Sequence, residues 1–220
     1  MRRRRSKVSA FTLVELIVLI GIIVLLLCFA IPGGIRARQE AKRIRCVSYL
    51  KQIGLSFRMW SSDQTANYPM VVSVTNGGTL EVSNEVWRTM QVMSNELGTP
   101  FILACLSDTR KPATNFATLA NSNISYFIGL DAPESMPESP LVGDRFLSVG
   151  RAPDNKVLTI GTNDAVSWGG KNHQGGGNIA LADGSVRQFT SEQIYGQFTN
   201  AMRLNREGNG KATLRLAMPE

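Results

Sequence analysis

The longest apolar stretch of the chain lies close to its beginning, from Leu13 to Ile31. These 19 residues include one ionisable side chain, Glu15. A helix of this length measures about 28 Å, close to the thickness of a bilayer's hydrocarbon core. The pattern therefore predicts a membrane-spanning helix. Because a carboxylate in hydrocarbon is costly, it also predicts a functional role for Glu15.

A cleaved secretory signal is the first alternative for this stretch. Such signals have an apolar core of about 7–15 residues followed by a small-residue cleavage site. Here the run is longer, and Pro32, Gly33, Gly34 and then basic residues follow it. We therefore expect a retained anchor whose helix is kinked or briefly melted at Pro32-Gly33-Gly34.

Beyond this point the pattern changes to that of an amphipathic helix. Apolar residues recur at steps of three or four, with basic and amide side chains mostly between them. These apolar residues are Ile44, Val47, Leu50, Ile53, Phe57 and Trp60. The sequence thus predicts one long helix, the first half in lipid and the second half packed on a globular head.

The remaining segments predict that this head contains a sheet and two further helices. The predicted strands are 71–75, 79–82, 101–105, 124–129, 157–160, 178–182 and 185–189. Asn76-Gly77-Gly78 and Asp183-Gly184 are hairpin signals. Helices are expected over 86–97, closed by Gly98, and from Thr190, which opens a capping box with Gln193. A proline-rich loop is expected at 131–140, and a mobile tail from Asn205 as far as a last apolar segment at 213–216.

The net charge is unevenly distributed. Of the formal net charge of +7, five positive charges lie in residues 1–10, at Arg2, Arg3, Arg4, Arg5 and Lys7, which leaves +2 for the rest. A basic flank predicts that residues 1–10 stay in the cytoplasm. The nearly neutral remainder argues against a nucleic-acid-binding head.

Two of the three cysteines fall in the predicted head. Cys28 lies inside the apolar run, whereas Cys46 and Cys105 lie beyond it. An exported head would be in a compartment that permits disulfides. The sequence leaves open whether Cys46 and Cys105 pair, because pairing depends on geometry.

The segment Lys7-Val8-Ser9-Ala10-Phe11-Thr12-Leu13-Val14-Glu15-Leu16 resembles the class III signal of type IV prepilins and type II secretion pseudopilins. The resemblance implies that a prepilin peptidase removes the leader 1–10 between Ala10 and Phe11 and methylates Phe11. Glu15 would then be the fifth residue of the mature chain, and Pro32 would match the family's helix-kinking proline. One departure is Ala10, where the family normally has glycine.

A second resemblance extends over most of the chain. The segments CVSYLKQIGLSFRMWSSDQTANYP, CLSD, SYFIGL and NHQGGGNIALADGSV are similar to a bacterial prepilin-like group named for an H-X9-DG signature. His173, Asp183 and Gly184 match that signature. This resemblance identifies a family without identifying a ligand.

Together the resemblances imply an α+β, type IV pilin-like fold, with a long N-terminal α-helix packed on an antiparallel β-sheet head. The expected domains are a cleaved leader 1–10, an assembly helix 11–34 and an extracytoplasmic head 35–220. The implied function is that of a subunit of a type II secretion pseudopilus or type IV pilus, anchored in the inner membrane with its head outside the cytoplasm. The implied partners are the prepilin peptidase/methyltransferase, other pilin or pseudopilin subunits, the assembly platform and the lipid bilayer.

In such a filament, Glu15 would pair with the α-amino group of Phe11. That amino group could belong to its own chain or, as the resemblance favours, to a neighbouring subunit. The alternative is a Glu15 side chain that reaches the headgroup layer without a partner.

Catalytic chemistry is not expected. His173 is the only histidine, so neither a triad nor a His-rich metal site can be built around it. For the signature we expect a structural role, with Gly184 in a tight turn, Asp183 capping backbone N–H groups and His173 joining the preceding loop to the hairpin. No cofactor is expected, although a calcium site at Asn163, Asp164 and Asp183 is an alternative.

Two other functional classes remain open from the sequence. A head anchored as a monomer could bind envelope polysaccharide, and a minor pilin could bind DNA.

Trp168, in a glycine-flanked segment, is the tryptophan that we expect to contact a neighbouring subunit, whereas Trp60 and Trp87 are expected in the core.

Overall fold

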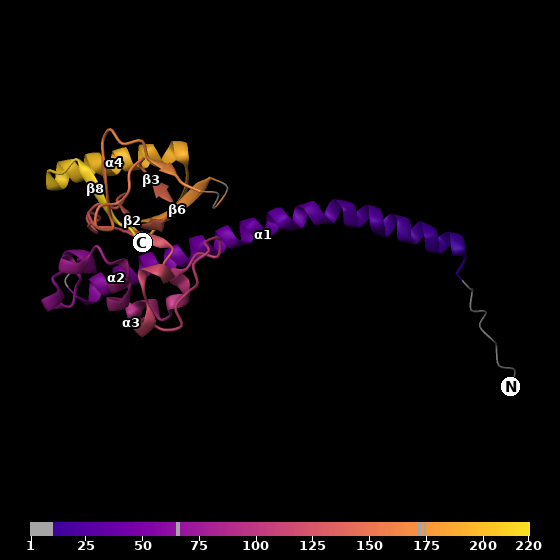
Figure 1. The fold of residues 1–220 in the computed structure, drawn as a ribbon, viewed down its shortest axis with the longest axis horizontal. Helices are drawn as coiled ribbons and strands as arrows, with labels where there is room; N and C mark the ends of the chain where they lie inside the picture. The colour runs from indigo at the N-terminus through magenta and orange to yellow at the C-terminus, as the bar shows by residue number, and fades with distance from the viewer. Residues whose placement is uncertain (1–10, 65–66, 171–172, 174) are drawn as a thin grey trace. The chain divides into compact units, whose positions relative to one another are not determined.

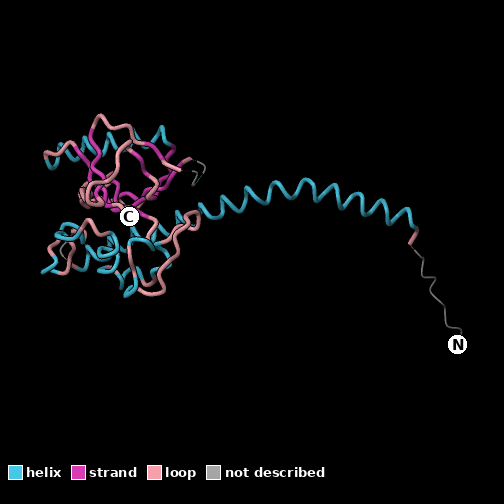
Figure 2. Tube along the Cα trace, in the orientation of Figure 1, coloured by secondary structure: helices cyan, strands magenta, loops and turns pink. Residues whose placement is uncertain are grey.

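The computed structural model describes residues 11–64, 67–170, 173 and 175–220, and the side chains of these residues except 29–36 and 209. The chain divides into two compact units, Met1–Ala41 and Lys42–Glu220. Helix α1 (Leu13–Asp63), 51 residues long, contributes to both of them (Figures 1 and 2). We call the described residues 11–41 the stem and residues 42–220 the head.

The stem consists of the first part of α1. Every described side chain from Phe11 to Cys28 is exposed, including large apolar ones such as Leu16 and Ile20. Within the described residues, no helix combines the length and the hydropathy that crossing a bilayer requires. The melted stretch that we expected at residues 32–34 does not form, because α1 is helical through them. A proline removes only one helical hydrogen bond and can be accommodated within a long helix.

The head is built around a six-stranded antiparallel sheet of order β4-β8-β1-β2-β6-β7. Its strands are β1 (Tyr126–Gly129), β2 (Pro140–Asp144), β4 (Val157–Gly161), β6 (Gly176–Leu181), β7 (Val186–Thr190) and β8 (Thr213–Ala217). Strands β3 (Leu147–Ser148) and β5 (Ser167–Trp168) form a separate two-stranded pair. The α+β architecture with an antiparallel sheet is therefore confirmed.

Both faces of this sheet are covered, which gives the head three layers. The second part of α1, with α2 (Val86–Val92) and α3 (Ser94–Leu97), lies on one face, and α4 (Ser191–Asn209) lies on the other (Figure 1). Neighbouring residues of one strand face opposite cores: Ile128 packs with the α1 side and Phe127 with the α4 side. This alternation follows from the two-residue period of a strand.

The apolar stripe of α1 differs from the prediction at its beginning. Ile44 is 58% exposed, and the buried residues start at Cys46. They continue with Leu50, Ile53, Phe57 and Trp60, which confirms the stripe from Leu50 onward, whereas Val47 is only partly buried.

The hairpin expected over 71–82 is wrong. This segment forms three short 3-10 helices, η1 (Pro69–Val71), η2 (Val74–Asn76) and η3 (Leu80–Val82). The Glu81 carboxylate accepts hydrogen bonds from the Val74 N–H at 2.8 Å and the Ser73 hydroxyl at 2.6 Å. A side chain thus satisfies a backbone group that a strand partner would otherwise have bonded.

The strand expected over 101–105 is also wrong, since η4 (Pro100–Leu103) occupies it. Pro100 fixes φ at the first position, and the Thr99 hydroxyl accepts a hydrogen bond from the Phe101 N–H. Two further 3-10 helices, η5 (Phe116–Thr118) and η6 (Asn121–Asn123), follow. The single helix expected over 86–97 is divided at Met93 into α2 and α3, although Gly98 does end it.

The C-terminal part agrees with the prediction except for its tail. Strands β6 and β7 form the expected hairpin, and Thr190 and Gln193 form the expected capping box of α4. The tail is not mobile, because α4 extends to Asn209 and β8 lies between β4 and β1. Asn205 is fully buried, and its amide donates to the Thr213 carbonyl at 2.8 Å.

Candidate functional site

The first candidate site is the beginning of α1, where Glu15 meets Thr12. The Glu15 carboxylate accepts hydrogen bonds from the Thr12 N–H and the Thr12 hydroxyl, both at 2.9 Å. The Glu15 N–H donates to the same hydroxyl at 3.3 Å. This reciprocal pattern is that of a capping box, in which Thr12 precedes the helix and Glu15 lies in its first turn. Glu15 therefore bonds Thr12 of its own chain, a contact that the sequence analysis, which named the α-amino group of Phe11, did not predict.

Two residues of the predicted processing and assembly signal cannot be placed. Ala10 and the rest of the leader 1–10 lie outside the described residues. The backbone of Pro32 is part of α1, but its side chain also lies outside them. Phe11 is described and is 74% exposed.

The second candidate site lies in the head, where a disulfide joins Cys46 to Cys105. Cys46 lies on α1 and Cys105 shortly after η4, at a sequence separation of 59. Their Cα atoms are 5.4 Å apart, within the range of about 4.4–6.8 Å that a disulfide needs. Both residues are buried. The bridge thus ties the second part of α1 to a segment distant in sequence.

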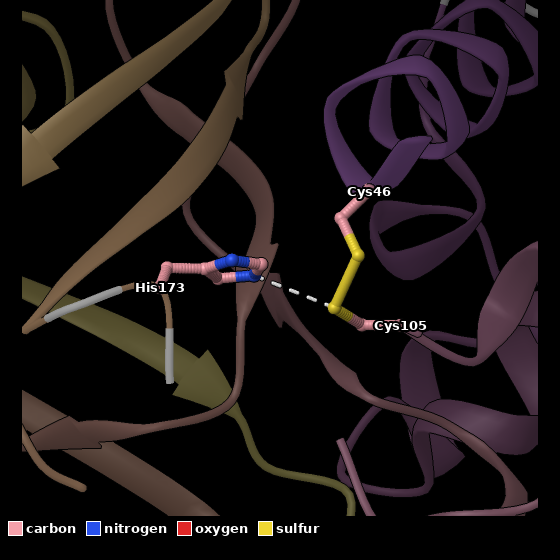
Figure 3. A group of neighbouring side chains, drawn as sticks. All are labelled: Cys46, Cys105 and His173. Carbon is pink, nitrogen blue, oxygen red and sulfur yellow. Dashed lines mark hydrogen bonds between the residues drawn. A yellow bond between two sulfur atoms is a disulfide. The ribbon is translucent and has the colours of Figure 1, made fainter. Parts of the chain in front are cut away.

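The single histidine lies against this disulfide (Figure 3). Its ring points toward the bridge, and its Nε2 atom lies 3.4 Å from Cys105 Sγ. His173 comes from the loop before β6, is 9% exposed, and has a left-handed backbone with φ of 50°. Such a backbone is uncommon for residues other than glycine, although histidine adopts it more often than most. The only histidine of the chain thus lies against the disulfide.

A buried carboxylate completes this cluster. Asp144, at the end of β2, places its Oδ2 atom 3.5 Å from His173 Nε2. The same oxygen accepts hydrogen bonds from the Asn178 N–H at 2.7 Å and the Asn178 side-chain amide at 2.9 Å. Burial raises the pKa of Asp144 to about 7, although the hydrogen bonds from Asn178 and the charge of Arg43 oppose this shift. We call Cys46, Cys105, His173 and Asp144 the His173 cluster.

Asp183 and Gly184 have the structural role that the sequence predicted. Gly184 has φ of 84°, in the left-handed region that glycine favours. The Asp183 carboxylate accepts a hydrogen bond from the Ser185 N–H at 2.8 Å. These two residues build the β6–β7 turn. The contacts of His173 Nε2 are instead with Cys105 and Asp144, which lie outside this turn.

The residues of the alternative calcium site are engaged differently. The Arg151 guanidinium donates to both oxygens of Asp164, at 2.7 and 2.5 Å, and lowers its pKa. Asn163 is exposed in the turn after β4, and Asp183 belongs to the β6–β7 turn. In the described part of the chain, the group of three metal-capable His, Cys, Asp or Glu side chains is Cys46, Cys105 and His173. The geometry therefore offers no support for calcium at Asn163, Asp164 and Asp183.

Trp168 is not the surface residue that we expected. It lies on β5, is 7% exposed and belongs to the core on the α4 side. A Cβ atom at Gly177 would lie 2.5 Å from its ring, so the ring packs directly on the β6 backbone. Trp60 is buried in the other core, and Trp87 packs against that core from its edge.

The His173 cluster is not predicted as a unit from the sequence. Cys46 and Cys105 enter the prediction as a possible pair and His173 as part of a turn, while Asp144 and Asn178 carry no prediction. Metal and catalytic motifs are recognised by short spacings, but here Cys105 lies 59 positions after Cys46 and His173 lies 68 positions after Cys105. The one available signal was that the only histidine and the only cysteines outside the apolar run belong to the same predicted head.

No protein-family profile matches the chain, and no curated protein or solved structure is detectably similar to it.

Proposed function

We propose that this protein is a structural, non-enzymatic subunit of a type IV pilus-like or type II secretion-like filament. Its N-terminal helix would be held in the inner membrane and then assembled into a helical bundle. A prepilin peptidase would remove residues 1–10, and the head would lie outside the cytoplasm. The observation that carries this proposal is the exposed apolar surface of the stem.

That surface needs a cover in the functional state. From Phe11 to Leu27 the exposed fractions of the large apolar side chains run from 47% to 74%. Contiguous exposed apolar surface of this kind marks an interaction with lipid or protein. A helix that is apolar on all sides can be covered by lipid before assembly and by neighbouring helices after it.

The head supports the same proposal by the way it holds α1. One stripe of the second part of the helix is buried in the head core, and the Cys46–Cys105 disulfide links the helix to the head. A subunit built in this way can transmit force from its head to its helix without losing its fold. An anchored binding protein would need the exposed helix but not the charge of Glu15.

The cleavage step is tested by the mass of the purified full-length protein. We expect a mature chain that begins at N-methylated Phe11 when the protein is produced with a prepilin peptidase. A catalytically inactive peptidase should leave residues 1–10 in place. Retention of the leader with the active enzyme would contradict the proposal and favour the anchored binding protein.

The role of the Glu15 charge is tested with two variants that separate charge from capping. Glu15→Gln removes the charge but keeps a side chain that can complete a capping box. Thr12→Ala removes the hydroxyl that bonds Glu15 and keeps the charge. We expect at least a tenfold loss of sheared filament protein for Glu15→Gln, because the partner's α-amino group loses its counter-ion in a low dielectric.

We expect Thr12→Ala to assemble within about twofold of the parent protein, since capping is worth only about 1 kcal/mol. Membrane-fraction levels of the three proteins provide the control for insertion. Normal filament levels with Glu15→Gln would rule out the charge pairing. Equal losses in both variants would show that the capping box, and not the charge, matters for assembly.

A further inference from the structure

The His173 cluster combines groups that are known in proteins as zinc ligands. Cys46 Sγ, Cys105 Sγ and a ring nitrogen of His173 all lie within 4.8 Å of one another (Figure 3). Thiolate sulfur and imidazole nitrogen are the preferred ligands of Zn²⁺. The three residues are buried, so a metal ion here would be shielded from solvent.

We propose that, when the Cys46–Cys105 disulfide is reduced, Cys46, Cys105 and His173 form a zinc site, so that the disulfide and the bound metal are two alternative states of one site. This inference does not depend on the proposed filament function.

The distances around His173 suit such a site. Tetrahedral coordination with Zn–S near 2.3 Å and Zn–N near 2.0–2.1 Å places neighbouring ligand atoms about 3.4–3.8 Å apart. His173 Nε2 lies 3.4 Å from Cys105 Sγ and 3.5 Å from Asp144 Oδ2. On reduction the two sulfur atoms must separate to about 3.8 Å, which small side-chain rotations can provide.

A hydrogen-bonded carboxylate lies beside these three ligands. Asp144 Oδ2 faces the same His173 nitrogen, and two hydrogen bonds from Asn178 hold that oxygen in place. Asp144 is not in the group whose ligand atoms all lie within 4.8 Å of one another, so a fourth ligand would be water or an Asp144 side chain that moves toward the ion. The Asn178 Oδ1 atom, on the same fully buried amide, has no hydrogen-bond partner among the described residues. A buried polar atom without a partner is unusual and indicates that a further polar group belongs here.

The change between the two states balances as a thiol–disulfide exchange. A dithiol reductant transfers two electrons to the disulfide and becomes a disulfide itself, which leaves two thiols on Cys46 and Cys105. Zinc binding then releases the two thiol protons. In the reverse direction, a small-molecule disulfide such as oxidised glutathione takes two electrons from the thiolates and two protons from water, and the Cys46–Cys105 bond forms while Zn²⁺ is released.

The test uses the full chain in detergent with Cys28→Ser, which removes the exposed thiol outside the site. The protein is reduced without oxygen and titrated with Zn²⁺ against a chromophoric chelator. We expect one zinc ion per reduced chain, at least a hundredfold weaker binding by the oxidised chain, and zinc release when oxidised glutathione is added. Titration with Co²⁺ should give the thiolate-to-metal charge-transfer band of sulfur ligation.

Variants assign the ligands. Cys46→Ser should weaken zinc binding at least a hundredfold, and His173→Asn at least tenfold. Asparagine tolerates the left-handed backbone that His173 adopts, so this variant limits strain. Asp164→Asn is the matched control, since Asp164 bonds Arg151 and Gly161, and it should leave zinc binding unchanged.

Near-ultraviolet circular dichroism of the reduced chain distinguishes a site in the folded head from binding by unfolded cysteines. If reduction unfolds the head, recovery of the signal on adding zinc supports the proposal, and failure to recover contradicts it. The proposal is also wrong if the reduced chain binds no zinc, if the oxidised chain binds it equally well, or if the cobalt spectrum lacks the thiolate band. Equal zinc affinity in His173→Asn and its parent would show that His173 is not a zinc ligand.

Discussion

The two parts of α1 carry similar side chains in opposite surroundings. In the stem, Leu19 is 47% exposed, whereas in the head Leu50 is completely buried. The difference is in the pattern and not in the residue type. From Leu13 to Ile31 the stem is apolar on all sides except at Glu15, but in the head the apolar residues of α1 form a single stripe. A stripe can be covered by one sheet, whereas an all-round apolar surface needs several neighbours or lipid.

The folding free energy of the monomer comes mainly from the head. Apolar side chains contribute in proportion to the surface that they remove from water. The head buries such surface on both faces of its sheet, and the stem does not. We therefore expect stem substitutions to alter assembly and head substitutions to alter stability.

Removing the disulfide should have the largest effect on the head. The bridge closes a loop of about 60 residues and so lowers the conformational entropy of the unfolded chain. Loss of this constraint corresponds to roughly 4 kcal/mol. We expect Cys46→Ser with Cys105→Ser to lower the free energy of unfolding by about that amount. Urea denaturation followed by tryptophan fluorescence measures this.

The control for the disulfide variant is Cys28→Ser, which changes an exposed residue of the stem. It should leave the urea midpoint unchanged. A similar midpoint for the double variant and the parent protein would show that the bridge does not hold the head together.

The comparison of Leu50 with Leu19 should give the next largest difference. Leu50→Ala leaves a cavity in the head core and should cost about 3 kcal/mol of unfolding free energy. Leu19→Ala should cost less than about 0.5 kcal/mol, because exposed positions contribute little. The same urea experiment, in detergent, measures both variants. Comparable losses would mean that the stem folds cooperatively with the head, against our interpretation.

The smallest of these effects concerns the partly buried ion pair of Asp108 with Arg145. Two guanidinium nitrogens of Arg145 contact the Asp108 oxygens at 2.8 and 3.0 Å. Burial alone would raise the pKa of Asp108, but the hydrogen bonds and charge of Arg145 outweigh it and lower the pKa. Asp108→Asn should cost about 2 kcal/mol at pH 7, the usual value of a charged hydrogen bond.

The lowered pKa of Asp108 determines how the stability difference between Asp108→Asn and the parent protein changes with pH. A carboxyl group whose pKa is lower in the folded state stabilises the protein above its unfolded value of about 3.9. That stability is lost as the pH falls through the folded pKa. Urea midpoints from pH 7 to pH 3 should therefore converge for Asp108→Asn and the parent. Asp63→Asn, at an exposed position near the end of α1, serves as the charge control.

The sequence analysis succeeded where the signal was local. The β6–β7 hairpin followed from Asp183-Gly184, and the start of α4 from Thr190 and Gln193. It failed at 71–82 and 101–105, where hydrogen bonds that the Ser73 hydroxyl donates to Glu81, and that Glu81 and Thr99 accept from backbone N–H groups, form instead of strand pairing. Apolar residues in that region looked like strands because short apolar runs do not distinguish a strand from a 3-10 helix.

The sequence alone thus determined the apolar helix, its continuation into a stripe, the antiparallel hairpin and the α+β class. Each of these depends on residues that are close together in the chain, where periodicity and turn geometry act directly. Only the tertiary structure brought Cys46, Cys105, His173 and Asp144 together, and only it placed Trp168 in the core. Such contacts depend on how a helix, a loop and two strands pack around one another, which no short spacing in a sequence records.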